Sequence, residues 1–110
     1  MHSTRYAVAL VLSGFALQAH PDAPLETAVA ISNFAFAPAT VTIAAGTTVR
    51  WKNLDGEPHT VRAIADSGPR SNPLDQNDSF AYRFDKPGTY RYVCSIHPQM
   101  AGTIVVKAAD

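Results

Sequence analysis

Three potential metal ligands lie within seven residues near the end of the chain. The segment reads Cys94-Ser95-Ile96-His97-Pro98-Gln99-Met100, so that a thiol, an imidazole and a thioether follow one another at regular spacing. One nitrogen donor and two soft sulfur donors suit copper, which cycles between Cu(I) and Cu(II). The segment therefore predicts a copper-binding loop that needs one more nitrogen ligand.

His59 is the candidate for that ligand, although it lies far from Cys94 in the sequence. Connections at one end of a Greek-key sandwich cluster in space, so the corner at 55–58 and the loop at 94–100 are expected to meet. Two imidazoles and a thiolate, with a weak axial thioether, form a type 1 copper site. We expect one copper ion held by His59, Cys94, His97 and Met100, and no catalytic residue.

The cysteine count supports this interpretation. The chain has a single cysteine, Cys94, which has no partner for an internal disulfide and would be a liability as a free thiol in an oxidising compartment. Taken singly, Cys94 would be a small buried residue, Met100 a gap-filler and His59 a loop histidine. Their combination in this order favours copper.

The first residues resemble a targeting segment. Arg5 gives a positive start, residues 6–17 are mostly apolar, and a small residue, Ala19, precedes a polar stretch. This pattern is typical of a secretory signal peptide, and the apolar run is shorter than the ~20 residues that span a membrane. We expect a signal peptide at 1–19, a flexible leader at 20–27, and export to the periplasm or beyond.

The remaining residues, 28–110, suffice for one domain with one core and are too few for two. The formal net charge of the whole chain is 0. Nucleic acids and anionic membranes attract strongly basic surfaces, which this balance does not provide. We therefore expect no nucleic-acid partner, no membrane insertion of the mature domain, and a monomer.

The organisation beyond the leader is that of an all-β protein. Short runs rich in β-branched and aromatic residues are separated by Gly and Pro turns, and no window shows a helical period. About seven to eight such strands predict a Greek-key antiparallel β-sandwich, with Trp51 in its core. The expected strands are 29–36, 40–43, 47–53, 60–63, 79–84, 89–94 and 103–107.

The chain resembles the cupredoxin family, and most closely amicyanin and plastocyanin-like small bacterial blue-copper proteins. The matching motifs are Phe-Ala-Phe-Ala-Pro at 34–38, Ala-Gly-Thr-Thr-Val-Arg-Trp-Lys-Asn at 45–53, Pro-His-Thr-Val at 58–61, and the stretch 88–100. The resemblance implies the same four copper ligands. It departs from the amicyanin pattern at Ile96, where several members have proline, and at Gln99, where amicyanins usually carry an aromatic residue.

The resemblance further implies a non-enzymatic carrier that exchanges single electrons with transient redox partners. In the family, electrons pass at the second histidine, so partners would dock near His97, Pro98 and Pro58. The sequence also suggests that Thr60 and Ser95 tie the two ligand loops together and that Asn53 braces the loop before His59.

Other functions remain open at this point. The same ligands could store or deliver copper in the periplasm. A structural zinc site is weaker because methionine is a poor zinc ligand. A nucleophilic Cys-His enzyme is weaker still, since no orienting third group or substrate cleft is evident.

Overall fold

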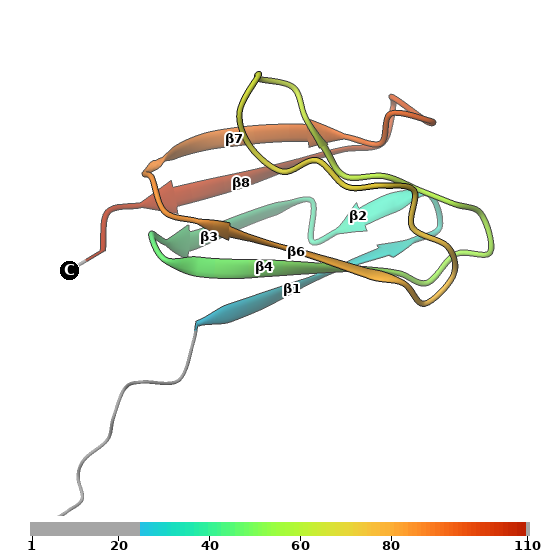
Figure 1. Ribbon diagram of the computed structural model, residues 1–110, viewed down its shortest axis with the longest axis horizontal. Helices are drawn as coiled ribbons and strands as arrows, with labels where there is room; N and C mark the ends of the chain where they lie inside the picture. The colour runs from blue at the N-terminus through green and yellow to red at the C-terminus, as the bar shows by residue number, and fades with distance from the viewer. Residues whose placement is uncertain (1–24, 110) are drawn as a thin grey trace, which may run out of the picture.

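A computed structural model describes residues 25–109, which form a two-layer β-sandwich. Each layer is a four-stranded sheet, and the two sheets stack face to face (Figure 1). The strands are β1 (Glu26–Ser32), β2 (Ala35–Ala37), β3 (Thr40–Ala44), β4 (Thr47–Asn53), β5 (Arg62–Ala63), β6 (Ser79–Phe84), β7 (Gly88–Val93) and β8 (Ala101–Lys107). The expected sandwich is confirmed.

The strand order is β2-β1-β4-β6 in one sheet and β3-β8-β7-β5 in the other. Two of the pairings, β1 with β4 and β3 with β8, are parallel, and the other pairings are antiparallel. Alternation of side chains has the same period in both kinds of ladder, so the sequence pattern could not distinguish them. Parallel neighbours require a crossover, which the chain makes by passing through the other sheet.

Alternating side chains from the facing strands fill the space between the sheets. Val41 and Ile43 of β3 and Val49 and Trp51 of β4 are buried, whereas their sequence neighbours point outward. This is the period-2 pattern of a strand with one face in the core. Trp51 has no exposed surface and contacts the ring of Tyr92 at 5.4 Å between centroids, so it joins the two sheets at the centre of the core.

The structure corrects the expected run at 29–36. A turn at Asn33 and Phe34 divides it into β1 and β2, which pair as an antiparallel hairpin. Ser32 and Asn33 interrupt the apolar run at this turn, and Asn tolerates the positive φ that Asn33 adopts. Phe34 also adopts positive φ, which is unusual for a bulky residue. The turn becomes important because it brings Phe34 to the metal centre.

Several strand boundaries also differ from expectation: β3 ends at Ala44, β7 spans Gly88–Val93 and β8 starts at Ala101. Strand β1 starts at Glu26, so Glu26 and Thr27, expected in the leader, instead pair with Thr48 and Val49 of β4. Strand β5 contains only Arg62 and Ala63, because the chain leaves the sheet on both sides of them. The expected signal peptide and most of the expected leader lie outside the described residues.

Within residues 25–109 the structure contains no helix long and apolar enough to cross a membrane.

The strand directions place the candidate ligands at one end of the sandwich. Strands β4 and β7 both run toward this end, and the chain leaving each of them carries the ligands (Figure 1). His59 follows β4, and Cys94 immediately follows β7. The short turns β3–β4 and β6–β7 lie at the opposite end, so the site is made by loops of one end alone.

Candidate metal centre

His59, Cys94 and His97 converge as the sequence predicts. The Nδ1 atoms of His59 and His97 each lie 3.8 Å from Cys94 Sγ. The three ligand atoms are all within 4.8 Å of one another. His59 and Cys94 are fully buried and His97 is half-buried, so the site opens to solvent only on the His97 side.

The spacing of these atoms fits a metal ion. A point equidistant from three atoms at such separations lies roughly 2.1 to 2.5 Å from each, which is the range of metal–nitrogen and metal–sulfur bonds. Two imidazole nitrogens and one thiolate sulfur are the trigonal donors of a type 1 copper site. The donor set therefore fits one type 1 copper ion.

The backbone of Met100 is held next to His97 and Cys94 by the loop's own hydrogen bonds. Its N–H donates to the His97 carbonyl at 2.8 Å, and its carbonyl accepts from Cys94 N–H at 3.1 Å. His97 N–H in turn donates to the Cys94 carbonyl at 3.1 Å. These bonds close two tight turns, one at 94–97 and one at 97–100. Met100 is 3% exposed. A buried thioether at the base of the loop is suited to weak axial ligation.

The surroundings of Cys94 favour the thiolate that a metal requires. Burial by itself would raise the pKa of this thiol. The Thr60 N–H, which donates to Sγ at 3.4 Å, and the neighbouring rings of His59 and His97 outweigh that effect. Together they lower the pKa of Cys94 from 9.0 to about 6. The sulfur is thus prepared for metal binding at neutral pH.

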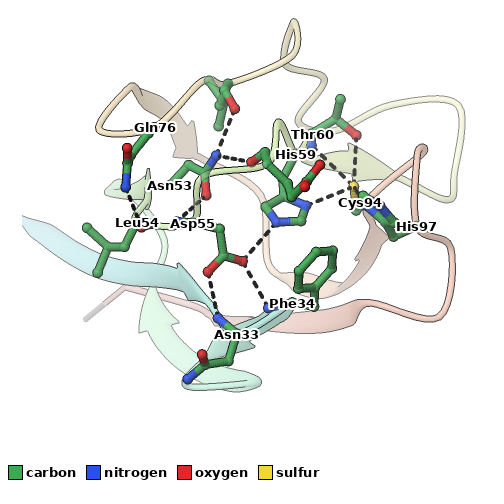
Figure 2. Close-up of polar contacts among 12 residues, drawn as sticks. Asn33, Phe34, Asn53, Leu54, Asp55, His59, Thr60, Gln76, Cys94 and His97 are labelled. Carbon is green, nitrogen blue, oxygen red and sulfur yellow. Dashed lines mark hydrogen bonds and ion pairs between the residues drawn. The ribbon is translucent and has the colours of Figure 1, made fainter.

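Asp55 fixes the orientation of the buried histidine (Figure 2). Its Oδ2 lies 2.9 Å from His59 Nε2, so that Nε2–H donates to the carboxylate and Nδ1 keeps its lone pair toward Cys94. The same carboxylate accepts the N–H groups of Asn33 and Phe34 at 2.8 and 2.9 Å. Burial would raise the pKa of Asp55, but the hydrogen bonds from Phe34, Asn33 and His59 lower it below its usual value.

Phe34 packs edge-on against both imidazoles. Its ring centroid lies 5.0 Å from that of His59 and 5.0 Å from that of His97, at interplanar angles of 86° and 83°. Its backbone adopts φ 59°, a costly conformation for a bulky residue. The bond from its N–H to Asp55 compensates in part for this cost. The β1–β2 turn is therefore a third loop of the site.

Sequence reasoning missed the roles of Asp55 and Phe34. Phe34 was noticed only as part of a motif, and Asp55 only as part of a corner. An acidic residue four positions before a ligand histidine was the available signal for Asp55. Ser32 and Asn33 could have signalled the turn, but no local signal placed Phe34 against the histidines, because that contact depends on the long-range bond from Phe34 N–H to Asp55.

The expected ties between the ligand loops are present. Thr60 Oγ1 accepts from Ser95 N–H at 2.7 Å and shares a hydrogen bond with Ser95 Oγ at 2.9 Å. Asn53 is fully buried and braces the loop that leads to His59. Its Nδ2 donates to the carbonyls of Glu57 and Leu74, both at 2.8 Å, and its Oδ1 accepts from Asp55 N–H at 3.0 Å. These bonds hold the ligands in place independently of a metal.

Fold and donor set together define a cupredoxin with a type 1 copper site, the kind of site found in electron-transfer proteins. Comparison with known proteins agrees. Residues 23–107 match the sequence pattern of the copper binding proteins of the plastocyanin/azurin family. The chain belongs to this family.

Individual relatives are similar over most of their length. Amicyanin-alpha of Methylorubrum extorquens is 34% identical over 107 residues, covering 93% of this chain and 90% of the relative. Plastocyanin of Scenedesmus fuscus is 39% identical over 84 residues, covering 66% of this chain and 86% of the relative. The solved structure of a purple cupredoxin from Nitrosopumilus maritimus superimposes with a TM-score of 0.68 at 30% identity, covering 73% of this chain and 98% of the cupredoxin. Amicyanin and plastocyanin are non-enzymatic electron carriers, in agreement with the expectation that this chain is not an enzyme.

Proposed function

We propose that His59, Cys94, His97 and Met100 bind one copper ion and that the protein passes single electrons through it between exported redox partners. The observation that carries the proposal is the buried triangle of two imidazole nitrogens and one sulfur, all within 4.8 Å. When bound, copper supplies the one-electron couple. The residues around it supply the geometry.

The hydrogen-bonded frame supports a carrier in particular. Asp55 holds the ring of His59, Thr60 and Ser95 connect the two loops, and Asn53 anchors the corner before His59. Ligands held this firmly keep one arrangement through both oxidation states, so little energy is lost to rearrangement during transfer. A delivery protein needs the opposite property, because its ligands must release the metal.

Partners dock, in this proposal, around the ring of His97. Pro58 and Pro98 are exposed there, and Ile96 is 47% exposed. His97 is the one ligand of the trigonal set that reaches the surface. A small apolar rim around a half-buried ligand suits a weak and transient encounter.

The proposal extends to processing and location. The family match starts at residue 23, just after the apolar segment at 6–17. This order supports a signal peptide at 1–19, a leader that begins at residue 20, and export of the cupredoxin domain to the periplasm.

Voltammetry of the copper-loaded protein tests the proposal. We expect a reversible one-electron couple and slow loss of copper to a chelator, because the ligands are buried and braced. Cys94→Ala, which removes the sulfur ligand, should abolish the couple. An irreversible response with rapid surrender of copper would instead identify a storage or delivery protein.

A further inference from the structure

The outer face of the sheet β3-β8-β7-β5 carries positive charge without any carboxylate. Side chains that point outward from this sheet include Arg62 of β5, Arg91 and Val93 of β7, and Lys107 of β8. No Asp or Glu occurs among its strands. The charge is concentrated at the β5 edge, next to the metal centre.

Strand pairing places three arginines together at this edge. Arg62 lies opposite Val93 in the β5–β7 ladder, and Arg91 is two residues from Val93 on the same face. On the other side of Arg62, the antiparallel bridge to Arg70 sets these two arginines directly opposite each other. Side chains of directly opposed residues leave the same face about 5 Å apart. We call Arg62, Arg70 and Arg91 the arginine patch.

No carboxylate forms an ion pair with the arginine patch within residues 25–109. Within this range the ion pairs are Arg50–Glu26, Arg83–Asp85 and the contact of His59 with Asp55. None of them includes a residue of the arginine patch. Asp66 is the only acidic residue between 58 and 74, and Arg70 bonds to its backbone carbonyl, not to its carboxylate. Like charges directly opposite each other in a ladder destabilise a sheet. The guanidinium of Arg70 is held by the carbonyls of Ala65 and Asp66, whereas no side-chain hydrogen bond of Arg62 or Arg91 is found within residues 25–109.

An exposed apolar side chain and a groove accompany the charges. Ile64 is 64% exposed, and its N–H donates to the Arg91 carbonyl at 3.0 Å, so it stands opposite Arg91 beside the patch. A groove of about 310 Å³ adjoins it, lined by Ala63, Ile64, Ala65, Ser67, Thr89, Tyr90 and Arg91. Arginine and exposed apolar residues around a shallow groove are typical of protein interfaces.

The arginine patch flanks the metal centre along the chain. Arg62 lies three residues after His59, and Val93, opposite Arg62, immediately precedes Cys94. A protein that covers the His97 end of the sandwich therefore borders this edge as well.

We propose that the arginine patch and Ile64 bind an acidic surface of the redox partner and orient it over the metal centre. The identity of the partner as a redox protein rests on the proposed function, whereas the acidic character of its surface rests on the patch alone. A protein fits better than a nucleic acid or a lipid surface. Three arginines on a chain of net charge 0, with an apolar anchor beside them, are too few charges for a polyanion.

Nuclear magnetic resonance of the ¹⁵N-labelled Cu(I) protein tests the surface directly, with a polyglutamate peptide of about 20 residues as the acidic probe. We expect shifts of the backbone amides of Arg62, Ile64, Arg70 and Arg91 at low ionic strength. The triple variant R62Q/R70Q/R91Q should lose them. The matched variant R50Q/K52Q/R83Q removes the same charge from the other sheet and should keep them.

Three results would overturn the proposal. The first is that polyglutamate causes no amide shifts at the arginine patch. The second is that both triple variants lose these shifts equally. The third is that the protein binds phosphatidylglycerol vesicles more tightly than polyglutamate. Since the titration follows backbone amides, it works equally on protein without copper. Failure of the copper-site proposal would therefore leave this test intact.

Electron-transfer rates provide the second readout. Oxidation of the Cu(I) protein by the hexacyanoferrate(III) trianion should slow about tenfold in R62Q/R70Q/R91Q at low salt, and the difference should vanish in about 0.5 M salt. A tris(phenanthroline)cobalt(III) cation should react no more slowly with the variant than with the parent protein. Equal slowing of both oxidants would show damage to the metal centre and contradict a steering role.

Discussion

At the scale of single residues, the site prepares its own ligands before any metal arrives. Cys94 receives the Thr60 N–H and lies between two imidazoles, whereas His59 donates to Asp55 and turns its free nitrogen inward. The thiolate of Cys94 and the orientation of His59 are thus those that a soft metal requires. The four ligands themselves were expected from the sequence, because the spacing of their side chains is local except for His59.

The titration of Cys94 in metal-free protein is one consequence. Its pKa of about 6 in the folded protein lies below the reference value of 9.0. The thiolate is therefore favoured by folding, so Cys94 stabilises the metal-free fold fully above pH 9.0 and this contribution disappears as the pH falls through 6. Thiolate absorbance near 240 nm, measured against pH, should rise with a midpoint near 6. A midpoint near 9 would contradict the hydrogen-bonding account of Cys94.

Asp55 should contribute to metal affinity through the orientation of His59. In Asp55→Asn the amide has one oxygen for three donors, so the ring of His59 loses its fixed orientation. We expect copper affinity, measured by chelator competition, to fall roughly tenfold. Asp85→Asn removes an exposed carboxylate at the other end of the sandwich and serves as the control. Equal affinities in the two variants would show that Asp55 does not position His59.

At the scale of elements, three loops rather than two enclose the centre. The β7–β8 loop and the loop before His59 were predictable because they carry ligand residue types. The β1–β2 turn was not, since Asn33 and Phe34 adopt positive φ without glycine and are held there by Asp55, a contact between distant parts of the chain. Local sequence patterns report local propensity, and they do not report such long-range bonds.

Phe34 should shield the ligand histidines from water and chelators. In Phe34→Ala the edges of His59 and His97 lose their aromatic cover, so the rate of copper transfer to a chelator should rise about tenfold. Leu54→Ala is a matched control, because Leu54 is likewise 45% exposed but has no aromatic contact with either histidine. If both variants release copper at the parent rate, Phe34 does not act as a cover.

At the scale of the whole molecule, the β-sandwich could be predicted from the sequence, but the direction in which neighbouring strands pair could not. Alternation in β3 and β4 identified the buried faces, including that of Trp51. The parallel pairs of β1 with β4 and β3 with β8 have the same alternation as antiparallel ones, so only the assembled sheets reveal them. The strand expected at 60–63 is present only as β5, Arg62 and Ala63, because the N–H groups of Thr60 and Val61 donate to Cys94 Sγ and Ser71 Oγ and not to a neighbouring strand.

Close packing across the sheet gives a prediction about stability. A Cβ at Gly102 would overlap the ring of Tyr92, a core side chain that is 1% exposed. Gly102→Ala should therefore lower the free energy of unfolding by about 2 kcal/mol and the Tm by roughly 10 °C. Gly56→Ala, where a Cβ meets no atom within 4 Å, is the control for thermal unfolding. Identical Tm values for both variants would contradict this packing.

The central claim is that two imidazoles, one thiolate and one thioether of this chain hold a single copper ion. Its most direct test is the visible and electron paramagnetic resonance spectrum of the protein during titration with copper(II). The account predicts an intense thiolate-to-copper absorption with narrow copper hyperfine splitting, saturating at one ion per chain and absent in Cys94→Ala. Weak absorption with the wide splitting of ordinary copper(II), unchanged in Cys94→Ala, would contradict it.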